Sequence, residues 1–128
     1  MTRTLLELEH AFRLSWSAET TCLNAESLTK WHPTNPAYGQ CGPTALVVQD
    51  LLGGDLLIAD VIGGNEKDEV HYWNRFTGGL EIDLTREQFS DHCIIGEPRI
   101  VLRPPEGPRA YVNEYQLLRA RVLSALNL

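Results

Sequence analysis

The sequence predicts an α+β fold in which helices come first, a two- or three-stranded antiparallel sheet follows, and a last helix ends the chain. Two observations predict it. Apolar residues recur at helical spacing near both ends of the chain and again after Cys41, whereas residues 56–84 hold short apolar runs separated by glycine turns. The chain has 128 residues, enough for a single core, so we expect residues 1–128 to form one domain.

Residues 4–16 predict an amphipathic helix that packs on the core, because apolar side chains at helical spacing alternate with charged ones. The apolar positions are Leu5, Leu8, Phe12 and Trp16. The polar residues 17–30 do not predict one particular structure. Either Ser17 or Asn24 is a suitable start for a short helical turn.

A proline-rich loop at residues 31–36 leads into an apolar helix that begins at about Cys41. Pro43 falls in the first turn, where a helix tolerates proline because that N–H would have no partner. Gly53 and Gly54 supply the left-handed cap at which we expect the helix to end.

The middle of the chain predicts a strand at residues 56–61 and then a hairpin. Residues 70–76 form its first strand, the glycine-rich residues 77–79 its turn, and residues 80–84 its second strand.

The last part of the chain predicts two short elements and a long helix. Thr85 and Gln88 have capping-box spacing, which indicates a short helix through Phe89. Residues 97–103 form one more candidate strand, and residues 112–126 a clear amphipathic helix. Its apolar face carries Tyr115, Leu118, Val122 and Leu126.

Cys41 is the candidate nucleophile because of its place at the start of a helix. Unpaired backbone N–H groups and the positive end of the helix dipole converge there. A thiol held in such a field ionises more easily than a free one, and the thiolate is the nucleophile. The alternative is that Cys41 is a small buried hydrophobic residue.

Three segments resemble the small bacterial YunG-like family: residues 39–46 (Gly-Gln-Cys-Gly-Pro-Thr-Ala-Leu), residues 71–74 (His-Tyr-Trp-Asn), and residues 81–85 (Glu-Ile-Asp-Leu-Thr) with Gln88 and Phe89. That family is similar in turn to papain-like cysteine peptidases, which share the order of cysteine on a helix, histidine on a strand, and Asp or Asn on the next strand. The resemblance covers residues 31–90. It implies a papain-like core, with a central helix bearing Cys41 packed on the sheet and the terminal helices flanking it.

The resemblance implies a catalytic triad. Cys41 would attack an acyl carbonyl as a thiolate, His71 would hold and then donate a proton, and Asp83 would orient the imidazole. Papain-like enzymes supply an oxyanion donor from a glutamine ahead of the cysteine. Here that position is Asn35, whereas Gln40 directly precedes Cys41, so both amides are candidates.

Each triad partner also has a structural reading. His71 fits a hydrogen-bonded core histidine, and Asp83 fits a solvent-facing strand residue or a helix cap. The hairpin adds a geometric condition. A two-residue turn at Gly78–Gly79 would place Asp83 near Arg75 or Thr77, so contact with His71 requires a longer loop or a diagonal contact.

Three aromatic residues are candidates for substrate binding. Trp31 and Tyr38 flank the cysteine loop, and Trp73 lies close to His71 in sequence; core packing is the alternative for such residues. Cys22 and Cys93 have no positional argument for reactivity and are expected to be structural.

Composition excludes several classes of function. The net charge is −6 and no basic run is present, which disfavours a nucleic-acid binder. The three cysteines form no C-x-x-C pair, and adjacent His92 and Cys93 make too small a ligand set, so we expect neither a metal nor another cofactor. No signal peptide or membrane span is apparent. We therefore expect a cytoplasmic protein with reduced thiols, although export by a specialised machinery would leave no such mark.

Together these features predict a cysteine hydrolase or acyl-transfer enzyme of peptidase, isopeptidase or amidase type. It would act on a peptide or protein substrate through an acyl-enzyme intermediate. A non-catalytic protein-binding module on the same scaffold is the first alternative, and a redox-sensing thiol at Cys41 is the second. The sequence does not define the oligomeric state.

Overall fold

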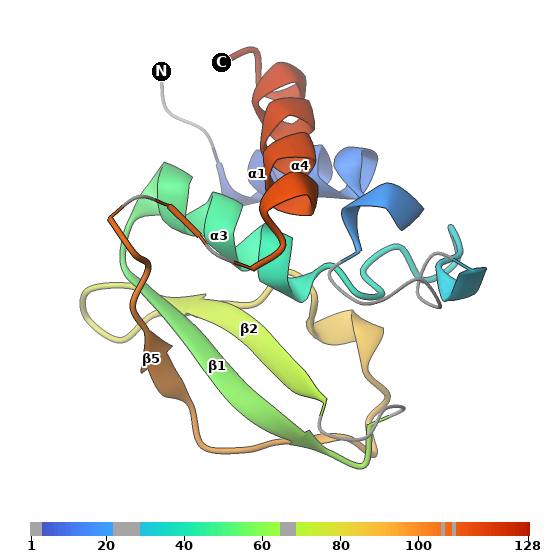
Figure 1. Cartoon of the computed structure of the whole chain (residues 1–128), viewed down its shortest axis with the longest axis vertical. Coiled ribbons are helices and arrows are strands. Elements are labelled where there is room, and N and C mark those ends of the chain that lie inside the picture. The colour runs from blue at the N-terminus through green and yellow to red at the C-terminus, as the bar shows by residue number, and fades with distance from the viewer. Residues whose placement is uncertain (1–3, 22–28, 65–68, 106, 109) are drawn as a thin grey trace.

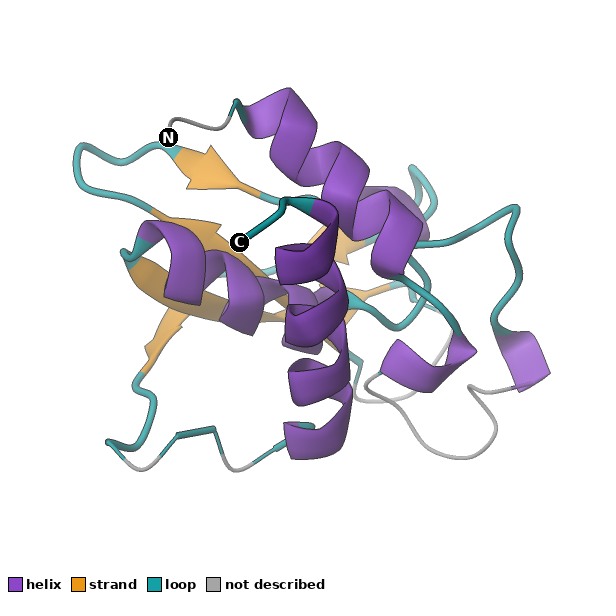
Figure 2. Cartoon of the chain, turned by 90° about the horizontal axis from the view of Figure 1, so that it is seen from above, coloured by secondary structure: helices purple, strands orange, loops and turns teal. Residues whose placement is uncertain are grey.

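The computed structural model describes residues 4–21, 29–64, 69–105, 107–108 and 110–128. This part of the chain confirms the α+β prediction, with three long α-helices on one side of an antiparallel sheet (Figure 1). The helices are α1 (Leu5–Ser15), α3 (Cys41–Leu52) and α4 (Val112–Ala125), close to the predicted bounds. Figure 2 shows them from above, with the strands beneath.

The sheet is larger than predicted, with five strands. They are β1 (Asp55–Ile62), β2 (Val70–Arg75), β3 (Glu81–Ile82), β4 (Ile94–Ile95) and β5 (Arg99–Val101). Strand β1 is the centre of the sheet, because it pairs antiparallel with β2, β4 and β5, while β3 pairs only with β2. The β1–β2 register places Ala59 opposite His71 and Leu57 opposite Trp73.

Helix α3 lies in the middle of the fold, between the other helices and the sheet. Its first eight residues, 41–48, are all buried. Val47 and Val48 pack with buried residues of α1 and α4, whereas Leu46 packs with Leu56 of β1. A helix that is apolar on so much of its surface is stable only when it is covered on more than one side. This position holds Cys41 between two layers.

Two further contacts fix where α3 begins and ends. The indole Nε1 of Trp16 donates to Oγ1 of Thr44 over 2.9 Å, which ties the end of α1 to the first turn of α3. Gly53 ends the helix with φ 74° and ψ −155°, a positive-φ conformation that glycine adopts without steric cost. The helix therefore ends at the predicted glycine, although this residue is not in the left-handed helical conformation that was expected.

The hairpin has its turn at the predicted residues 77–79, but its second strand differs from the prediction. Residues 76–80 form a loop closed by the Phe76 N–H donating to the Leu80 carbonyl over 2.7 Å, so the turn is longer than two residues. Strand β3 has two residues rather than the predicted five of residues 80–84. The capping box is wrong, because Thr85 makes no side-chain cap and the next element is the 3₁₀ helix η2 (Arg86–Gln88).

Some elements were ambiguous or missed in the sequence. Ser17 caps the 3₁₀ helix η1 (Ala18–Thr20) with a complete capping box, which confirms the first of the two starts considered. The other start, Asn24, lies outside the described residues. Strand β4 was missed because two residues are too few to show a pattern. In the described part of the chain, no helix combines the length and hydropathy that crossing a bilayer requires.

Candidate functional site

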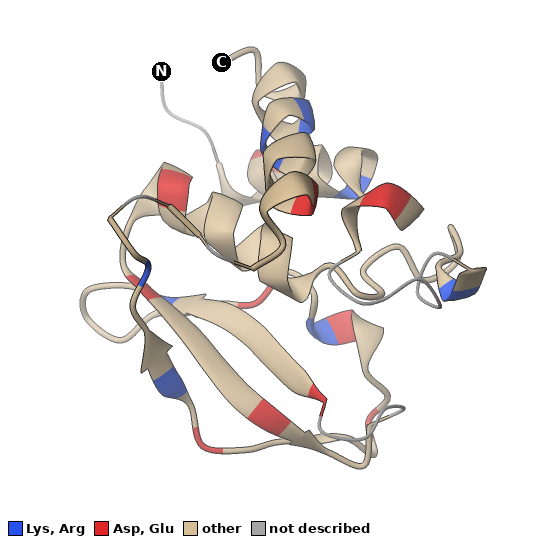
Figure 3. Ribbon diagram, in the orientation of Figure 1, with Lys and Arg blue, Asp and Glu red and all other residues tan. Residues whose placement is uncertain are grey.

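Three segments that are distant in sequence meet near the start of α3. Cys41 is the first residue of α3, His71 is the second residue of β2, and Asp83 directly follows β3. Figure 1 shows the start of β2, the start of α3 and η2 on the same side of the molecule. The first turn of α3 carries no charged residue, as the uncoloured ribbon in Figure 3 shows.

The Nε2 atom of His71 lies 2.7 Å from Oδ2 of Asp83. The hairpin register explains this contact. Asn74 pairs with Ile82, so Asp83 comes next and falls opposite Trp73. Side chains two residues apart on a strand share a face, so His71 is the diagonal neighbour of Asp83. The longer loop and the diagonal contact thus both occur.

Two aromatic rings hold the His71 imidazole, which is 0% exposed. Trp73 stacks on it with ring centroids 5.4 Å apart, and Phe89 meets it edge-on at 5.0 Å. Trp73 also donates from its indole to the carboxylate of Glu81. With its ring packed in this way, Trp73 is buried against His71 and is 8% exposed.

Cys41 also interacts with this imidazole. Burial lowers the pKa of His71, but hydrogen bonds to Asp83 and to Cys41, together with their charges, raise it to about 9. Asp83 occupies Nε2, and within the described residues Nδ1 has no partner at standard hydrogen-bond geometry. We infer that Nδ1 is the atom that faces the thiol, at the looser approach common in sites without substrate.

Unsatisfied polar atoms gather in this region. In the described part of the chain, the buried side-chain atoms without a hydrogen-bond partner are His71 Nδ1, Asp83 Oδ1 and Gln88 Nε2. Buried polar groups are normally paired, and exceptions concentrate where a structure has a chemical role. His71 belongs to β2, Asp83 directly follows β3, and Gln88 is the last residue of η2, next to Phe89, which packs against the imidazole.

Gln88 and Asn74 take part in the site in ways that the sequence did not indicate. Gln88 was expected only as a capping residue, but its Oε1 accepts a hydrogen bond from the Gly39 N–H over 3.1 Å and so joins η2 to the cysteine loop. Asn74 is buried and donates to the Ala45 carbonyl over 2.9 Å, which fixes α3 on β2. Both residues lie in the segments that carry the family resemblance; no spacing rule identifies their partners.

The two candidate oxyanion donors have different surroundings. Gln40 is fully buried; its Nε2 donates to the Ser17 carbonyl over 2.9 Å, and its Oε1 accepts from Thr20 over 2.6 Å. Its amide therefore holds η1 against the start of α3. Asn35 is half-buried in the preceding turn, where its carbonyl accepts from the Tyr38 N–H.

The other predicted residues lie around the site or away from it. Trp31 is half-buried and donates from its indole to the Pro36 carbonyl over 3.0 Å, and Tyr38 is also half-buried. Cys93 is buried, and its Sγ lies 3.4 Å from the Gly63 carbonyl oxygen. Cys22 lies outside the described residues. Among the residues that are described, no group of three or more His, Cys, Asp or Glu could hold a metal ion.

Comparisons with known proteins place this arrangement in one family. A protein of Bacillus subtilis (strain 168), called "Uncharacterized protein YunG", is 33% identical over 82 residues, which cover 64% of this chain and 60% of that relative's length. No solved structure gives a significant match. Residues 4–127 of this chain match a protein family that is described as "YunG protein". Since that match spans nearly the whole sequence, the chain belongs to the YunG family.

Proposed function

We propose that the protein is a cysteine hydrolase or acyl-transfer enzyme on a papain-like core, with Cys41 as nucleophile. The observation that supports this is the buried imidazole of His71, which Asp83 holds at Nε2 and with which Cys41 also interacts. Cysteine, histidine and carboxylate in that order form the generalised triad. The substrate is an amide or thioester in a peptide or protein, and the triad needs no cofactor.

In the first step, the Cys41 thiolate attacks the carbonyl carbon and a carbon–sulfur bond forms. Negative charge develops on the carbonyl oxygen, and backbone N–H groups at the start of α3 are suited to stabilise it. The bond to the leaving group then breaks. For an amide substrate, the His71 Nδ1 proton moves to the leaving nitrogen, so a neutral amine departs and a thioester remains on Cys41.

In the second step, water or an acceptor amine attacks the thioester. His71 takes the proton of that nucleophile at Nδ1, the carbon–sulfur bond breaks, and the thiolate and imidazolium are restored. Asp83 remains a carboxylate throughout and keeps the ring oriented through Nε2. Water gives hydrolysis and an amine gives transfer.

The pKa of His71 suits this role. Because Asp83 and Cys41 raise it to about 9, against the opposing effect of burial, the ring is protonated near neutral pH. A protonated ring pairs with a thiolate and is the form that can donate to a leaving group. The chemistry requires a reduced thiol, which we propose is maintained in the cytoplasm.

A non-catalytic protein-binding module is the second candidate, and burial favours it. Cys41 is 4% exposed and His71 is 0% exposed, as core residues would be. In such a module the Cys41 thiol would contribute packing only.

Alkylation by iodoacetamide at neutral pH separates these candidates. Peptide mapping by mass spectrometry gives the rate at each cysteine, and buried Cys93 is the internal control. The enzyme proposal predicts that Cys41 reacts at least about tenfold faster than Cys93, and that His71→Ala removes this difference. Equal rates at the two cysteines would favour the binding module.

A further inference from the structure

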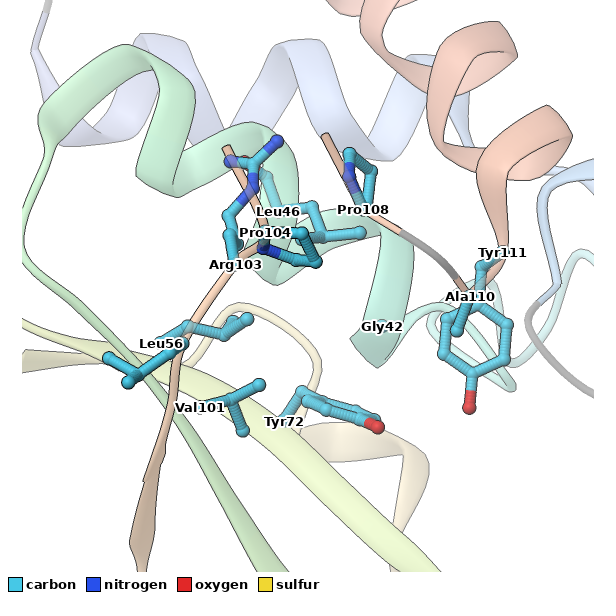
Figure 4. A pocket seen from close by; sticks show the side chains of 11 residues that line it. Gly42, Leu46, Leu56, Tyr72, Val101, Arg103, Pro104, Pro108, Ala110 and Tyr111 are labelled. Carbon is cyan, nitrogen blue, oxygen red and sulfur yellow. The ribbon is translucent and has the colours of Figure 1, made fainter. Parts of the chain in front are cut away.

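A cavity of about 280 Å³ lies beside the first turn of α3 (Figure 4). Its walls come from three parts of the fold: α3, the sheet, and the segment that leads from β5 to α4. The residues that define it are Gly42, Leu46, Leu56, Tyr72, Val101 and Tyr111. Figure 4 shows Tyr72 and Tyr111 on the side where α3 begins, next to Gly42.

The cavity adjoins the candidate nucleophile. Gly42, which lines it, directly follows Cys41 at the start of α3, and neighbouring Cα atoms are only about 3.8 Å apart. Tyr72 also lines it and follows His71 in β2, but successive strand residues point to opposite faces of a sheet, so the cavity adjoins Cys41 rather than the His71 ring. Gly42 has no side chain, which leaves the backbone beside Cys41 as part of the wall.

The lining is apolar. Arg103 is the only charged residue among those described around the cavity, and it is already paired with Asp50, with Nη1 2.7 Å from Oδ1. Its guanidinium also lies over the ring of Tyr115, 5.4 Å from the centroid, and Figure 4 shows it directed away from Tyr72. Among the lining residues that the structure describes, an acidic ligand would therefore find no uncompensated cation, whereas an apolar group would leave water for a favourable apolar surface.

Two tyrosines of the cavity wall are held in a constrained arrangement. Tyr111 meets Tyr72 edge-on, with ring centroids 6.2 Å apart. The backbone of Tyr111 is left-handed, with a φ of 57°, which is uncommon for a residue other than glycine. Strained backbone of this kind is frequent where a side chain is held for a purpose.

We propose that this cavity is the specificity pocket of the Cys41 site, and that it receives a large aliphatic or aromatic side chain from the acyl part of a peptide or amide substrate. Its volume of about 280 Å³ is just below the range for small-molecule pockets, roughly 300–1,000 Å³, which fits one side chain rather than a large ligand. The inference rests on the proposed function, since it assigns the substrate of the same site.

The test uses peptidyl acyloxymethyl ketones as probes. The Cys41 thiolate displaces the carboxylate of such a probe and forms a thioether, so the alkylation rate reports how well the peptide part is bound. Probes carry Leu, Phe, Gly or Asp either at the ketone-bearing residue or at the residue before it. At one of these positions, the Leu and Phe probes react at least about tenfold faster than the Gly and Asp probes.

Two variants and a matched control test whether the preference for Leu and Phe probes arises in this cavity. Val101→Trp fills the cavity, and the rates with Leu and Phe probes fall to that with the Gly probe. Ile100→Trp is the control, because Ile100 is the preceding residue of β5, is 52% exposed and does not line the cavity; it retains the preference. Tyr111→Gly, which suits a left-handed backbone, lowers the Leu-to-Gly rate ratio at least about threefold.

Iodoacetamide separates failure of the pocket from failure of the proposed function. It has no side chain to bind, so Val101→Trp and Ile100→Trp leave its rate at Cys41 unchanged. Fast reaction with iodoacetamide and no side-chain preference, or a preference that survives Val101→Trp, overturns the pocket alone. If Cys41 reacts with iodoacetamide no faster than Cys93, both proposals are wrong.

Discussion

The imidazole of His71 and the carboxylate of Asp83 meet at 2.7 Å although the two residues are not directly opposite in the hairpin. The contact is diagonal, and it depends on the five-residue loop 76–80 that sets the register. It joins a fully buried ring to a carboxylate that is 23% exposed. Asp83, which controls the protonation of His71, can therefore be substituted without exposing the hydrophobic core.

Replacing Asp83 by Asn is expected to lower the pKa of His71. The amide preserves the shape of the side chain but removes the charge and the strong hydrogen bond that oppose the effect of burial. We expect a fall of at least about one unit, measured by NMR titration of the labelled imidazole. Asp91→Asn, a change at an exposed carboxylate, is the control and leaves the pKa unchanged. An unchanged pKa in Asp83→Asn would show that the carboxylate does not set it.

His71 is expected to make stability depend on pH above neutrality. Its folded pKa of about 9 lies above the unfolded value of 6.5, so its contribution is fully present below about pH 6.5 and is lost as pH rises through 9. The largest contribution is of order 3 kcal/mol. Urea unfolding of the wild type and of His71→Gln should give free energies that converge as the pH approaches 9. A difference that stays constant from acid to alkaline pH would contradict the raised pKa.

Gln40 is expected to be structural rather than an oxyanion donor. Gln40→Ala removes two buried hydrogen bonds, to Ser17 and Thr20, and should lower the free energy of unfolding by about 2 kcal/mol. The iodoacetamide rate at Cys41 in the folded variant, and its turnover of any substrate found with the probes, should stay within about twofold of the wild type. Loss of turnover at unchanged stability would instead indicate that Gln40 is an oxyanion donor.

Gln88 is expected to position the cysteine loop. Gln88→Ala removes the acceptor for the Gly39 N–H and should slow the alkylation of Cys41 about threefold or more, with a loss of about 1 kcal/mol in stability. Gln116→Ala, at an exposed position of α4, is the matched control and changes neither quantity. A stability loss with full Cys41 reactivity would mean that the contact is only structural.

The sequence predicted the long elements well because their signals are local. The apolar spacing of residues 4–16 and 112–126, Pro43 in a first turn, and Gly53 as a cap each depend on a few neighbouring residues. The short strands β3 and β4 have two residues each, and only their partners in the sheet define them.

The candidate site could be predicted in part for the same reason. The place of Cys41 at a helix start follows from local pattern, and the family resemblance supplied His71 and Asp83. The diagonal contact between these two residues required the actual register of the hairpin. The engagement of Gln40 with η1 and of Gln88 with Gly39 depends on side-chain contacts between distant segments, which a single sequence does not encode in its spacing.

The pH dependence of Cys41 alkylation tests the central claim most directly. If His71 holds Cys41 as a thiolate, the wild-type protein reacts with iodoacetamide at about pH 6 almost as fast as at about pH 8, while His71→Ala at about pH 6 is at least about tenfold slower. A wild-type rate that rises with pH as that of an ordinary thiol does, and that is the same in His71→Ala, would contradict the account.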